Sequence, residues 1–180
     1  MTAARQALIQ RFREEGSIQG DIVKVDSFLN HMVDPALMRV VGQDLAERFK
    51  SNGINKILTA ESSGIMVAQA VATELNIPFI FAKKKRSVTM KKFYTASSYS
   101  YTKQEATTLY VSHEVLQPGE RILFIDDFFA KGTTLKALTE IIRQARAELA
   151  GCAVIINKSK REDIESILHL NELKTLQKPK

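Results

Sequence analysis

The 180-residue sequence has no tryptophan, one cysteine, four prolines and eight glycines. Because a single thiol cannot form an internal disulfide, Cys152 favours a reducing compartment, and we expect a cytoplasmic protein. No apolar run approaches the length of a membrane span. Residues 1–15 alternate charged and apolar side chains and lack the apolar core of a signal peptide. We therefore expect neither a disulfide-stapled secreted scaffold nor a membrane protein.

Repeats and low-complexity tracts are also absent. The three histidines, His31, His113 and His169, form no ligand-spaced group with one another or with Cys152, so no metal held by the protein alone is expected. The 26 basic residues exceed the 20 acidic ones by 6. Such an excess favours an anionic partner, either a phosphorylated small molecule or a nucleic acid. The length fits one well-buried domain, which we expect to span residues 1–180.

Apolar spacing along the chain indicates alternating strands and helices. Asp34 followed by Pro35 is typical of a helix start, because the carboxylate can cap the helix and proline suits its first position. The predicted strands are Ile22–Val25, Lys56–Ala60, Pro78–Ala82, Ile122–Ile125 and Cys152–Ile156, and the predicted helices are Thr2–Glu15, one from Pro35 that ends at Asn52-Gly53, Ser63–Leu75 and Thr133–Leu149. Short apolar strands separated by helices favour an α/β fold whose parallel sheet is covered on both faces.

A polar stretch at about residues 83–118 interrupts this alternation. It is rich in Lys, Ser, Thr and Tyr, and alternation near Thr107–Ser112 suggests a hairpin. A polar insertion of this length in a compact domain is more often a functional lid than a plain connector. If this insertion is a lid, we expect it to fold over a ligand and exclude water with Tyr94, Tyr99 and Tyr101. The alternative is an exposed hairpin whose tyrosines pack on the body of the protein.

Chemistry concentrates after the strand Ile122–Ile125, where Asp126 and Asp127 follow directly. Carboxyl ends of strands are where open α/β sheets bind ligands. The next segment, residues 130–134 (AKGTT), opens a helix with small residues and two hydroxyls that can surround a phosphate. Because carboxylates can accept hydrogen bonds from a diol, this segment favours a ligand with both a vicinal diol and a phosphate. The alternative is a solvent-exposed strand end before an N-capped helix.

The segment Ile122–Thr134 resembles the signature by which type I phosphoribosyltransferases bind phosphoribosyl pyrophosphate (PRPP). That signature usually reads apolar residues, two acids, two apolar residues, then Ala-Thr-Gly-Gly-Thr. Here Lys131 replaces the first Thr and Thr133 replaces the second Gly, whereas Gly132 and Thr134 remain.

Further segments are similar to bacterial xanthine phosphoribosyltransferases: Lys24–Pro35, Glu61–Ile65, Phe81–Ser87, Thr95–Gln104 and Asn157–Ser159. The resemblance implies a central, mainly parallel sheet flanked by helices, a small hood built from the N-terminal segment and the C-terminal tail, and a flexible lid hairpin. It also implies a purine-salvage transferase, typically a homodimer, that moves the phosphoribosyl group from PRPP to xanthine. The tail after Ser159 has no aromatic residue and looks shorter than is usual in this family.

The resemblance also implies roles for individual residues. The expected catalytic residues are Asp126, Asp127, Lys83 and Lys84. The expected PRPP-binding residues are Ala130, Lys131, Gly132, Thr133, Thr134, Glu61, Ser62 and Ser63. The expected purine-binding residues are Val23, Asn30, Phe128 and Lys158. Read without the resemblance, the serines are helix caps, the lysines solvated surface, and Phe128 part of the core.

Mg²⁺ carried by the pyrophosphate is the expected cofactor. Ala130 stands where hypoxanthine-guanine enzymes usually have an aspartate, which favours a xanthine or adenine enzyme, although other purines remain alternatives. The rival hypothesis is a non-catalytic regulator that senses PRPP and binds nucleic acid. Such regulators normally carry a separate DNA-binding domain, and the roughly 20 residues before the matched region are too few for one.

Overall fold

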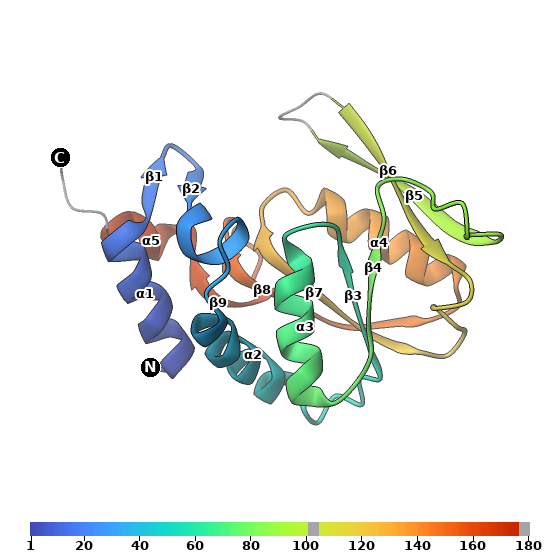
Figure 1. Cartoon of the computed structure of the whole chain (residues 1–180), viewed down its shortest axis with the longest axis horizontal. Helices are drawn as coiled ribbons and strands as arrows, with labels where there is room; N and C mark the ends of the chain where they lie inside the picture. Colours follow the sequence, from blue (N-terminus) through green and yellow to red (C-terminus); the bar gives the residue numbers. More distant parts are fainter. Residues whose placement is uncertain (101–104, 177–180) are drawn as a thin grey trace.

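The computed structural model describes residues 1–100 and 105–176. Its centre is a five-stranded parallel sheet with the strand order β4-β3-β7-β8-β9 (Figure 1). The strands are β3 (Lys56–Ala60), β4 (Phe79–Ala82), β7 (Arg121–Phe129), β8 (Glu148–Asn157) and β9 (Glu165–His169). The predicted α/β class with a parallel sheet is therefore confirmed. No helix among the described residues combines the length and apolar character needed to cross a membrane.

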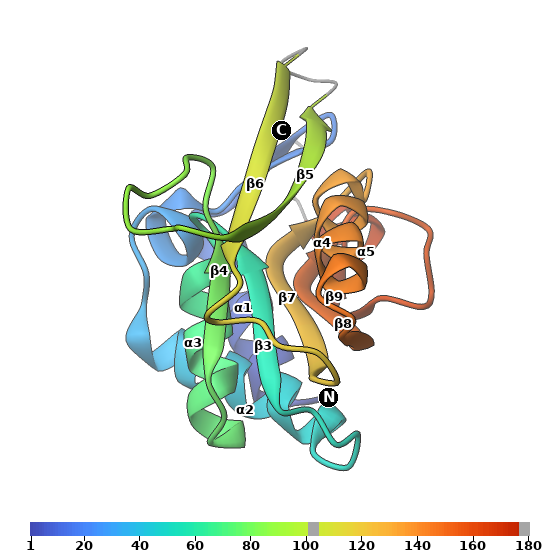
Figure 2. The same cartoon turned by 90° about the vertical axis from the view of Figure 1, so that its right-hand side faces the viewer.

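Helices cover both faces of this sheet (Figure 2). The helices α1 (Ala3–Glu15), α2 (Pro35–Phe49) and α3 (Gly64–Leu75) pack on one face, and α4 (Thr133–Gln144) packs on the other. Because side chains alternate along a strand, Leu123 and Ile125 join the first apolar cluster, whereas Ile122 and Phe124 join the second. The short continuous apolar runs of the sequence therefore reflect strands that are buried on both sides.

The start of α2 follows its capping signal, whereas the predicted end of α4 does not hold. The Asp34 carboxylate accepts hydrogen bonds from the backbone N–H groups of Ala36 and Leu37 at 2.9 and 3.2 Å, as a helix start requires. The predicted extension of α4 to Leu149 is wrong, because the helix ends at Gln144 and Arg146 has a left-handed φ of 57°. The chain then enters β8 at Glu148.

A hood stands beside the sheet and combines both ends of the described chain (Figure 1). It contains α1, the antiparallel pair β1 (Ser17–Gln19) and β2 (Ile22–Lys24), the short π-helix η1 (Asp26–Asn30), and α5 (Leu170–Leu176). Ion pairs join its parts: Arg5 contacts Glu172, and Lys174 Nζ lies 3.0 Å from Asp21 Oδ1. The tail after Ser159 thus folds back through β9 and α5 onto the N-terminal segment, and neither element was predicted.

A long antiparallel hairpin projects from the body over the carboxyl edge of the sheet (Figures 1 and 2). It consists of β5 (Phe93–Ser100) and β6 (Glu105–Ser112), and we call it the lid hairpin. The predicted hairpin within residues 83–118 is confirmed, and it is longer than the alternating segment indicated. Tyr94 stacks on His113 with ring centroids 3.9 Å apart, so it packs within the hairpin base. Tyr101 and the side chain of Tyr99 lie outside the described part of the chain.

Candidate active site

The connections of the sheet diverge between β3 and β7. The chain leaves β3 through α3 toward β4, and it leaves β7 through α4 toward β8 on the opposite side. Ligands of open α/β sheets bind in the crevice at such a switch point, outside the carboxyl ends of the strands. Pairing of β3 with β7 stops at Leu58 and Phe124, whereas pairing of β7 with β8 continues to Phe129 and Asn157. The last residues of β7 are therefore paired with β8 alone.

Asp126 and Asp127 lie in this free section of β7. The predicted end of the strand at Ile125 is wrong, because hydrogen bonding to β8 carries the strand through the acid pair to Phe129. Asp126 Oδ1 accepts a hydrogen bond from the backbone N–H of Asp127 at 3.0 Å, and Asp127 Oδ1 accepts one from the N–H of Phe128 at 2.9 Å. These bonds hold both carboxylates against the backbone.

The Asp126 carboxyl is crowded by the start of α3. A Cβ atom at Gly64 would lie 2.6 Å from Asp126 Oδ1 and 2.2 Å from Thr59 Oγ1, so only glycine fits here. Burial, and next the negative charge of Asp127, raise the pKa of Asp126 well above its ordinary value of 3.8, and the charge of Lys84 partly offsets them. A ligand that donates hydrogen bonds or brings positive charge would stabilise the ionised form.

Asn30 connects the hood to the second carboxylate. Its Nδ2 lies 3.5 Å from Oδ2 of Asp127, which is itself only 6% exposed. This contact turns Asn30 Oδ1 the other way, where it is buried without a hydrogen-bond partner in the described structure. Because buried acceptors are nearly always paired, this oxygen is placed to accept a hydrogen bond from a bound ligand or from water.

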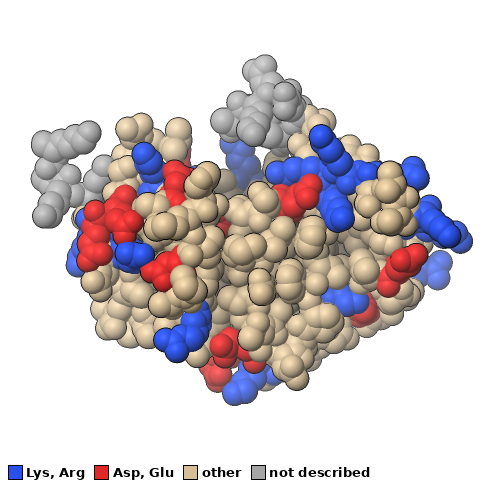
Figure 3. All heavy atoms as spheres, in the orientation of Figure 1, with Lys and Arg blue, Asp and Glu red and all other residues tan. Residues whose placement is uncertain are grey.

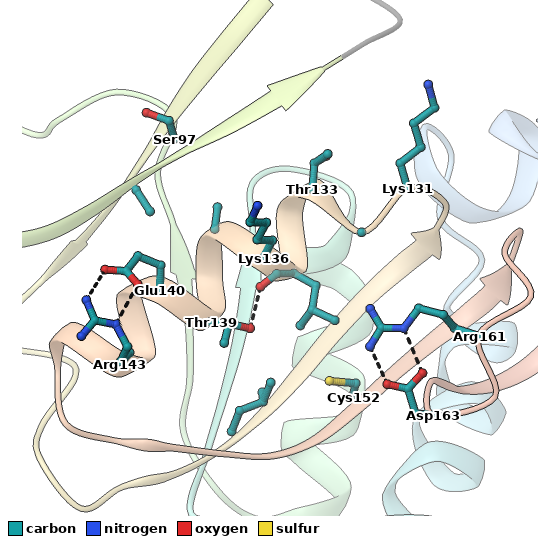
Figure 4. Close-up of a pocket in the computed structure, with 15 residues that line it drawn as sticks. Ser97, Lys131, Thr133, Lys136, Thr139, Glu140, Arg143, Cys152, Arg161 and Asp163 are labelled. Atoms are coloured by element: carbon teal, nitrogen blue, oxygen red, sulfur yellow. Dashed lines mark hydrogen bonds and ion pairs between the residues drawn. The ribbon is translucent and has the colours of Figure 1, made fainter.

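The loop of residues 130–134, which we call the phosphate loop, surrounds a cavity of about 130 Å³ that Asp126 also lines. Gly132 N-caps α4 with a φ of +72°, and a Cβ there would lie 2.9 Å from Phe129 Cζ. The loop places the positive end of α4 and the hydroxyls of Thr133 and Thr134 beside the cavity, as a phosphate requires. Lys131 is exposed, and its side chain extends away from the helix axis (Figure 4).

A larger groove of about 970 Å³ lies on the other side of the phosphate loop, between α4, the lid hairpin and β8 (Figure 4). The two hollows share Lys131, Gly132 and Thr133. Cys152 lines the floor of this groove, and burial raises the pKa of its thiol to about 11. The thiol is therefore a poor nucleophile at neutral pH.

The loop after β3 faces the acid pair from the neighbouring strand. Its Glu61–Ser62 peptide bond is cis, and the Glu61 carboxylate accepts a hydrogen bond from the backbone N–H of Lys84. Ser63 occupies the N-cap position of α3 but makes no side-chain capping hydrogen bond. The capping alternative for the two serines therefore does not describe Ser63, and its hydroxyl is not used to hold the helix.

Lys83 and Lys84 follow β4 and have different surroundings. Lys83 forms an isolated β-bridge with Tyr110 of the lid hairpin, and its Nζ lies 5.9 Å from the centre of the Phe81 ring. Lys84 is exposed, and its charge acts on the Asp126 carboxyl. Of the two lysines, Lys84 is thus the one whose charge reaches the crevice.

The hood and the loop after β8 meet over Phe128. Lys158 Nζ lies 5.0 Å from the centre of the Phe128 ring and donates a hydrogen bond to the backbone oxygen of Asp21 at 3.2 Å. Val23, only 9% exposed, belongs to the apolar cluster on which Phe128 packs. A half-buried aromatic ring, a cation and the Asn30 amide thus border the hood side of the crevice.

Seen from outside, the molecule is hollowed between the hood and the lid hairpin, and Lys and Arg side chains gather on the hairpin side (Figure 3). The residues named from the sequence lie in the hood, at the end of β7 and in the loops that follow β3, β4, β7 and β8. Sequence reasoning missed Thr59, because a buried threonine inside a strand carries no distinguishing pattern. It noted Gly64 only as part of a helix start. Within the described residues, no three His, Cys, Asp or Glu side chains form a metal-binding group.

Comparison with known proteins places this geometry in context. Residues 31–170 match the family described as the phosphoribosyl transferase domain. The chain is 47% identical over 154 residues to a xanthine phosphoribosyltransferase of Heliobacterium modesticaldum, covering 85% of this chain and 82% of that protein. It is 44% identical over 166 residues to a xanthine phosphoribosyltransferase of Oenococcus oeni, covering 91% and 81%.

Solved structures share the fold at lower identity. An adenine phosphoribosyltransferase from Rhodothermus marinus superposes with a TM-score of 0.72 at 22% identity, covering 92% of this chain and 99% of that one. An adenine phosphoribosyltransferase from Giardia lamblia, complexed with 9-deazaadenine, gives a TM-score of 0.70 at 19% identity, covering 89% and 97%. The sheet, its flanking helices and the antiparallel hairpins therefore form the fold of type I phosphoribosyltransferases.

Proposed function

Because the chain belongs to the phosphoribosyl transferase family, we propose that it transfers the 5-phosphoribosyl group of PRPP to xanthine, releasing pyrophosphate and xanthosine 5′-monophosphate. One observation carries the reaction type: the acid pair and the phosphate loop lie together at the switch point of a parallel sheet. The choice of xanthine is supported by relatives that are 44–47% identical and bear that name.

We place PRPP across the crevice with each charged part on a matching group. The 5-phosphate occupies the cavity of the phosphate loop, where the start of α4 favours negative charge. The ribose diol donates hydrogen bonds to Asp126 and Asp127, which relieves the repulsion between the two carboxylates. The pyrophosphate lies between the loop at Glu61–Ser63 and the ammonium group of Lys84.

Catalysis then depends on position and charge. The bond from the anomeric carbon to the pyrophosphate breaks as the purine nitrogen approaches, so positive charge develops on the sugar and negative charge on the leaving group. Asp126 and Asp127 stabilise the former, and Lys84 stabilises the latter. A Mg²⁺ ion carried by the pyrophosphate would add charge neutralisation, and the carboxylate oxygens of Asp126 and Asp127 would suit such a hard cation.

The base pocket favours an oxopurine. Asn30 Oδ1 is a buried acceptor without a partner in the described structure, and xanthine offers ring N–H groups that can donate to it. Lys158 supplies only donors, so it suits a purine oxygen and disfavours the exocyclic amine of adenine. Phe128 provides an apolar surface below Lys158 for the ring. Ala130 brings no acidic proton acceptor to the base.

The proposal is tested by turnover of the full chain with PRPP, Mg²⁺ and each of xanthine, guanine, hypoxanthine and adenine. We expect pyrophosphate release to be fastest with xanthine and slowest with adenine. A preference for another oxopurine would correct the specificity only. No pyrophosphate release with any base, together with salt-dependent binding of nucleic acid, would instead favour a PRPP-sensing regulator.

Lys158→Met is expected to raise the KM for xanthine about tenfold or more, because a hydrogen bond to a charged group contributes about 1.5–3 kcal/mol. Methionine keeps an unbranched apolar stem over Phe128, so the KM for PRPP should change by less than about twofold. Steady-state kinetics with each substrate varied in turn gives both constants. Lys160→Met, at a neighbouring exposed position, is the matched control. Equal losses in the two variants would contradict a base-binding role for Lys158.

We also infer that the enzyme acts as a homodimer in the reducing cytoplasm. The lone, half-buried Cys152 supports a reducing compartment. Sedimentation of the purified chain tests the dimer, because a monomer mass at assay concentration would contradict it.

A further inference from the structure

The base of the lid hairpin is held on both edges by hydrogen bonds, which lie in one row across Lys83, Tyr110, Thr95 and Gln144. On β6, Tyr110 exchanges two backbone hydrogen bonds of 2.9 Å with Lys83, the residue after β4. Tyr110 faces Thr95 of β5 in the hairpin register. Because both backbone groups of Tyr110 point toward Lys83, this is a non-hydrogen-bonded pair, and the backbone groups of Thr95 point outward on the other side.

The side-chain amide of Gln144 forms hydrogen bonds with both of these backbone groups of Thr95. Its Oε1 accepts from the N–H of Thr95 at 3.3 Å, and its Nε2 donates to the carbonyl oxygen of Thr95 at 3.0 Å. The side-chain amide therefore makes the two bonds that a further strand would make. Nε2 also donates to Glu140 at 3.1 Å, which sets the orientation of the amide. Hydrogen bonds from Arg143 and Gln144 lower the pKa of Glu140 to about 2, so this acceptor is ionised at neutral pH.

This row divides the hairpin into a docked and a projecting part. Tyr94 and Ala96 pack on the second apolar cluster, and Leu109, opposite Ala96, is buried in it. Ser97 is exposed on β5, and the groove of about 970 Å³ separates this part of the hairpin from α4 (Figure 4). The row at Thr95 is thus where the projecting part is attached, with open space between it and the phosphate loop.

The two ends of the row lead to the two phosphate-binding regions of the proposed site. Lys83 precedes Lys84, whose charge reaches Asp126. Gln144 is the last residue of α4, and the phosphate loop begins that same helix. A shift of Lys84 can therefore reach the base of the hairpin through Lys83, and a shift of the phosphate loop can reach it along α4 through Gln144.

We propose that Gln144 is a positioning residue, which sets the angle at which the lid hairpin stands over PRPP by acting as a side-chain strand for Thr95. This inference rests on the proposed function. Of the four residues in the row, Gln144 alone bonds through its side chain, so Gln144 can be changed without altering the backbone bonds between Lys83 and Tyr110. Loss of its bonds populates hairpin orientations that do not cover the crevice, and PRPP affinity falls in proportion to the competent fraction.

Gln144→Ala is expected to make the Thr95 amide exchange with solvent at least about tenfold faster and to raise the KM for PRPP about fivefold to tenfold, with kcat changed by less than about twofold. Gln144→Glu keeps the side-chain volume but loses the donor to Thr95 and repels Glu140. It should give the same PRPP defect even if the alanine variant folds poorly. Lys50→Ala, at an exposed position after α2, should match the parent in both measurements.

Unchanged exchange at Thr95 in both Gln144 variants would overturn the proposal, as would fast exchange with an unchanged KM for PRPP. Calorimetric titration of PRPP with Mg²⁺ in the absence of a base repeats the affinity comparison without catalysis. If the parent chain turned over no purine, the proposed function would fail, whereas the Thr95 exchange and the PRPP titration would still decide the role of Gln144.

Discussion

Replacing Asp126 and Asp127 together by asparagine is expected to weaken PRPP binding at least about a hundredfold. Each carboxylate is placed to accept a hydrogen bond from the ribose diol, and a hydrogen bond to a charged group contributes about 1.5–3 kcal/mol. Two such bonds correspond to a factor of about 10² or more in affinity. The fold should persist, because both residues lie at the crevice end of β7, beyond its pairing with β3.

The single variant Asp126→Asn should at the same time be more stable than the parent at neutral pH. Because the folded pKa of Asp126 lies above its ordinary value of 3.8, the folded chain binds this proton more tightly than the unfolded chain does. Its favourable contribution to stability is complete below that ordinary value and is lost as the pH rises through the folded pKa. The neutral asparagine removes this loss, so the stability difference between variant and parent should grow with pH.

Two measurements check this prediction. Calorimetric titration with PRPP and Mg²⁺ gives the affinity, and thermal unfolding at a series of pH values gives the stability. Glu74→Gln removes an exposed carboxylate in the last turn of α3 and should change neither. Parent-like PRPP affinity in the double variant would mean that the acid pair is structural. A parent-like pH profile in Asp126→Asn would mean that the pKa of this carboxyl is not raised.

The sequence could predict the elements whose signals are local. The Asp34-Pro35 start, the strand Lys56–Ala60 and the parallel sheet follow from capping chemistry and apolar patterning, which act over a few residues. The boundaries of β7 and α4 were wrong, because partners distant in sequence decide them. Pairing with β8 extends β7 past Ile125, and pairing of Glu148 with Arg121 ends the helical path. The elements β9 and α5 were not predicted, because they are only 5 and 7 residues long and so carry little apolar pattern.

The candidate site shows the same division. The acid pair and the small-residue loop lie close together in the sequence, so they can be recognised as one motif. The Asn30–Asp127 contact joins residues 97 positions apart in the sequence, and the hydrogen bonds between Gln144 and Thr95 join residues 49 positions apart. Such contacts depend on how the hood and the lid hairpin settle on the sheet, which no local pattern records. The residues that orient the site are therefore harder to predict than the residues that bind.

Replacing Gly64 by alanine is expected to weaken both the fold and PRPP binding, because there is no space for a methyl group at this position. Its Cβ would lie 2.2 Å from Thr59 Oγ1 and 2.6 Å from Asp126 Oδ1, and both atoms must move. Overpacking of this kind costs about 1–3 kcal/mol, against which alanine gains up to about 1 kcal/mol in helix propensity. Gly64→Ala is therefore expected to lower the melting temperature by a few degrees, at about 2–4 °C per kcal/mol. The displaced Asp126 should raise the KM for PRPP about tenfold or more.

The double variant Thr59→Ala, Gly64→Ala separates the two contacts. Thr59 Oγ1 is buried without a partner in the described structure, so its removal costs little hydrogen bonding and opens the space that the new methyl group needs. Stability should largely return, whereas PRPP binding should stay weak because Asp126 remains displaced. Gly119→Ala is the matched control: its φ of +79° makes alanine unfavourable, but no atom lies within 4 Å of the new Cβ. Recovery of both stability and PRPP affinity in the double variant would show that Gly64 serves packing against Thr59 and not the position of Asp126.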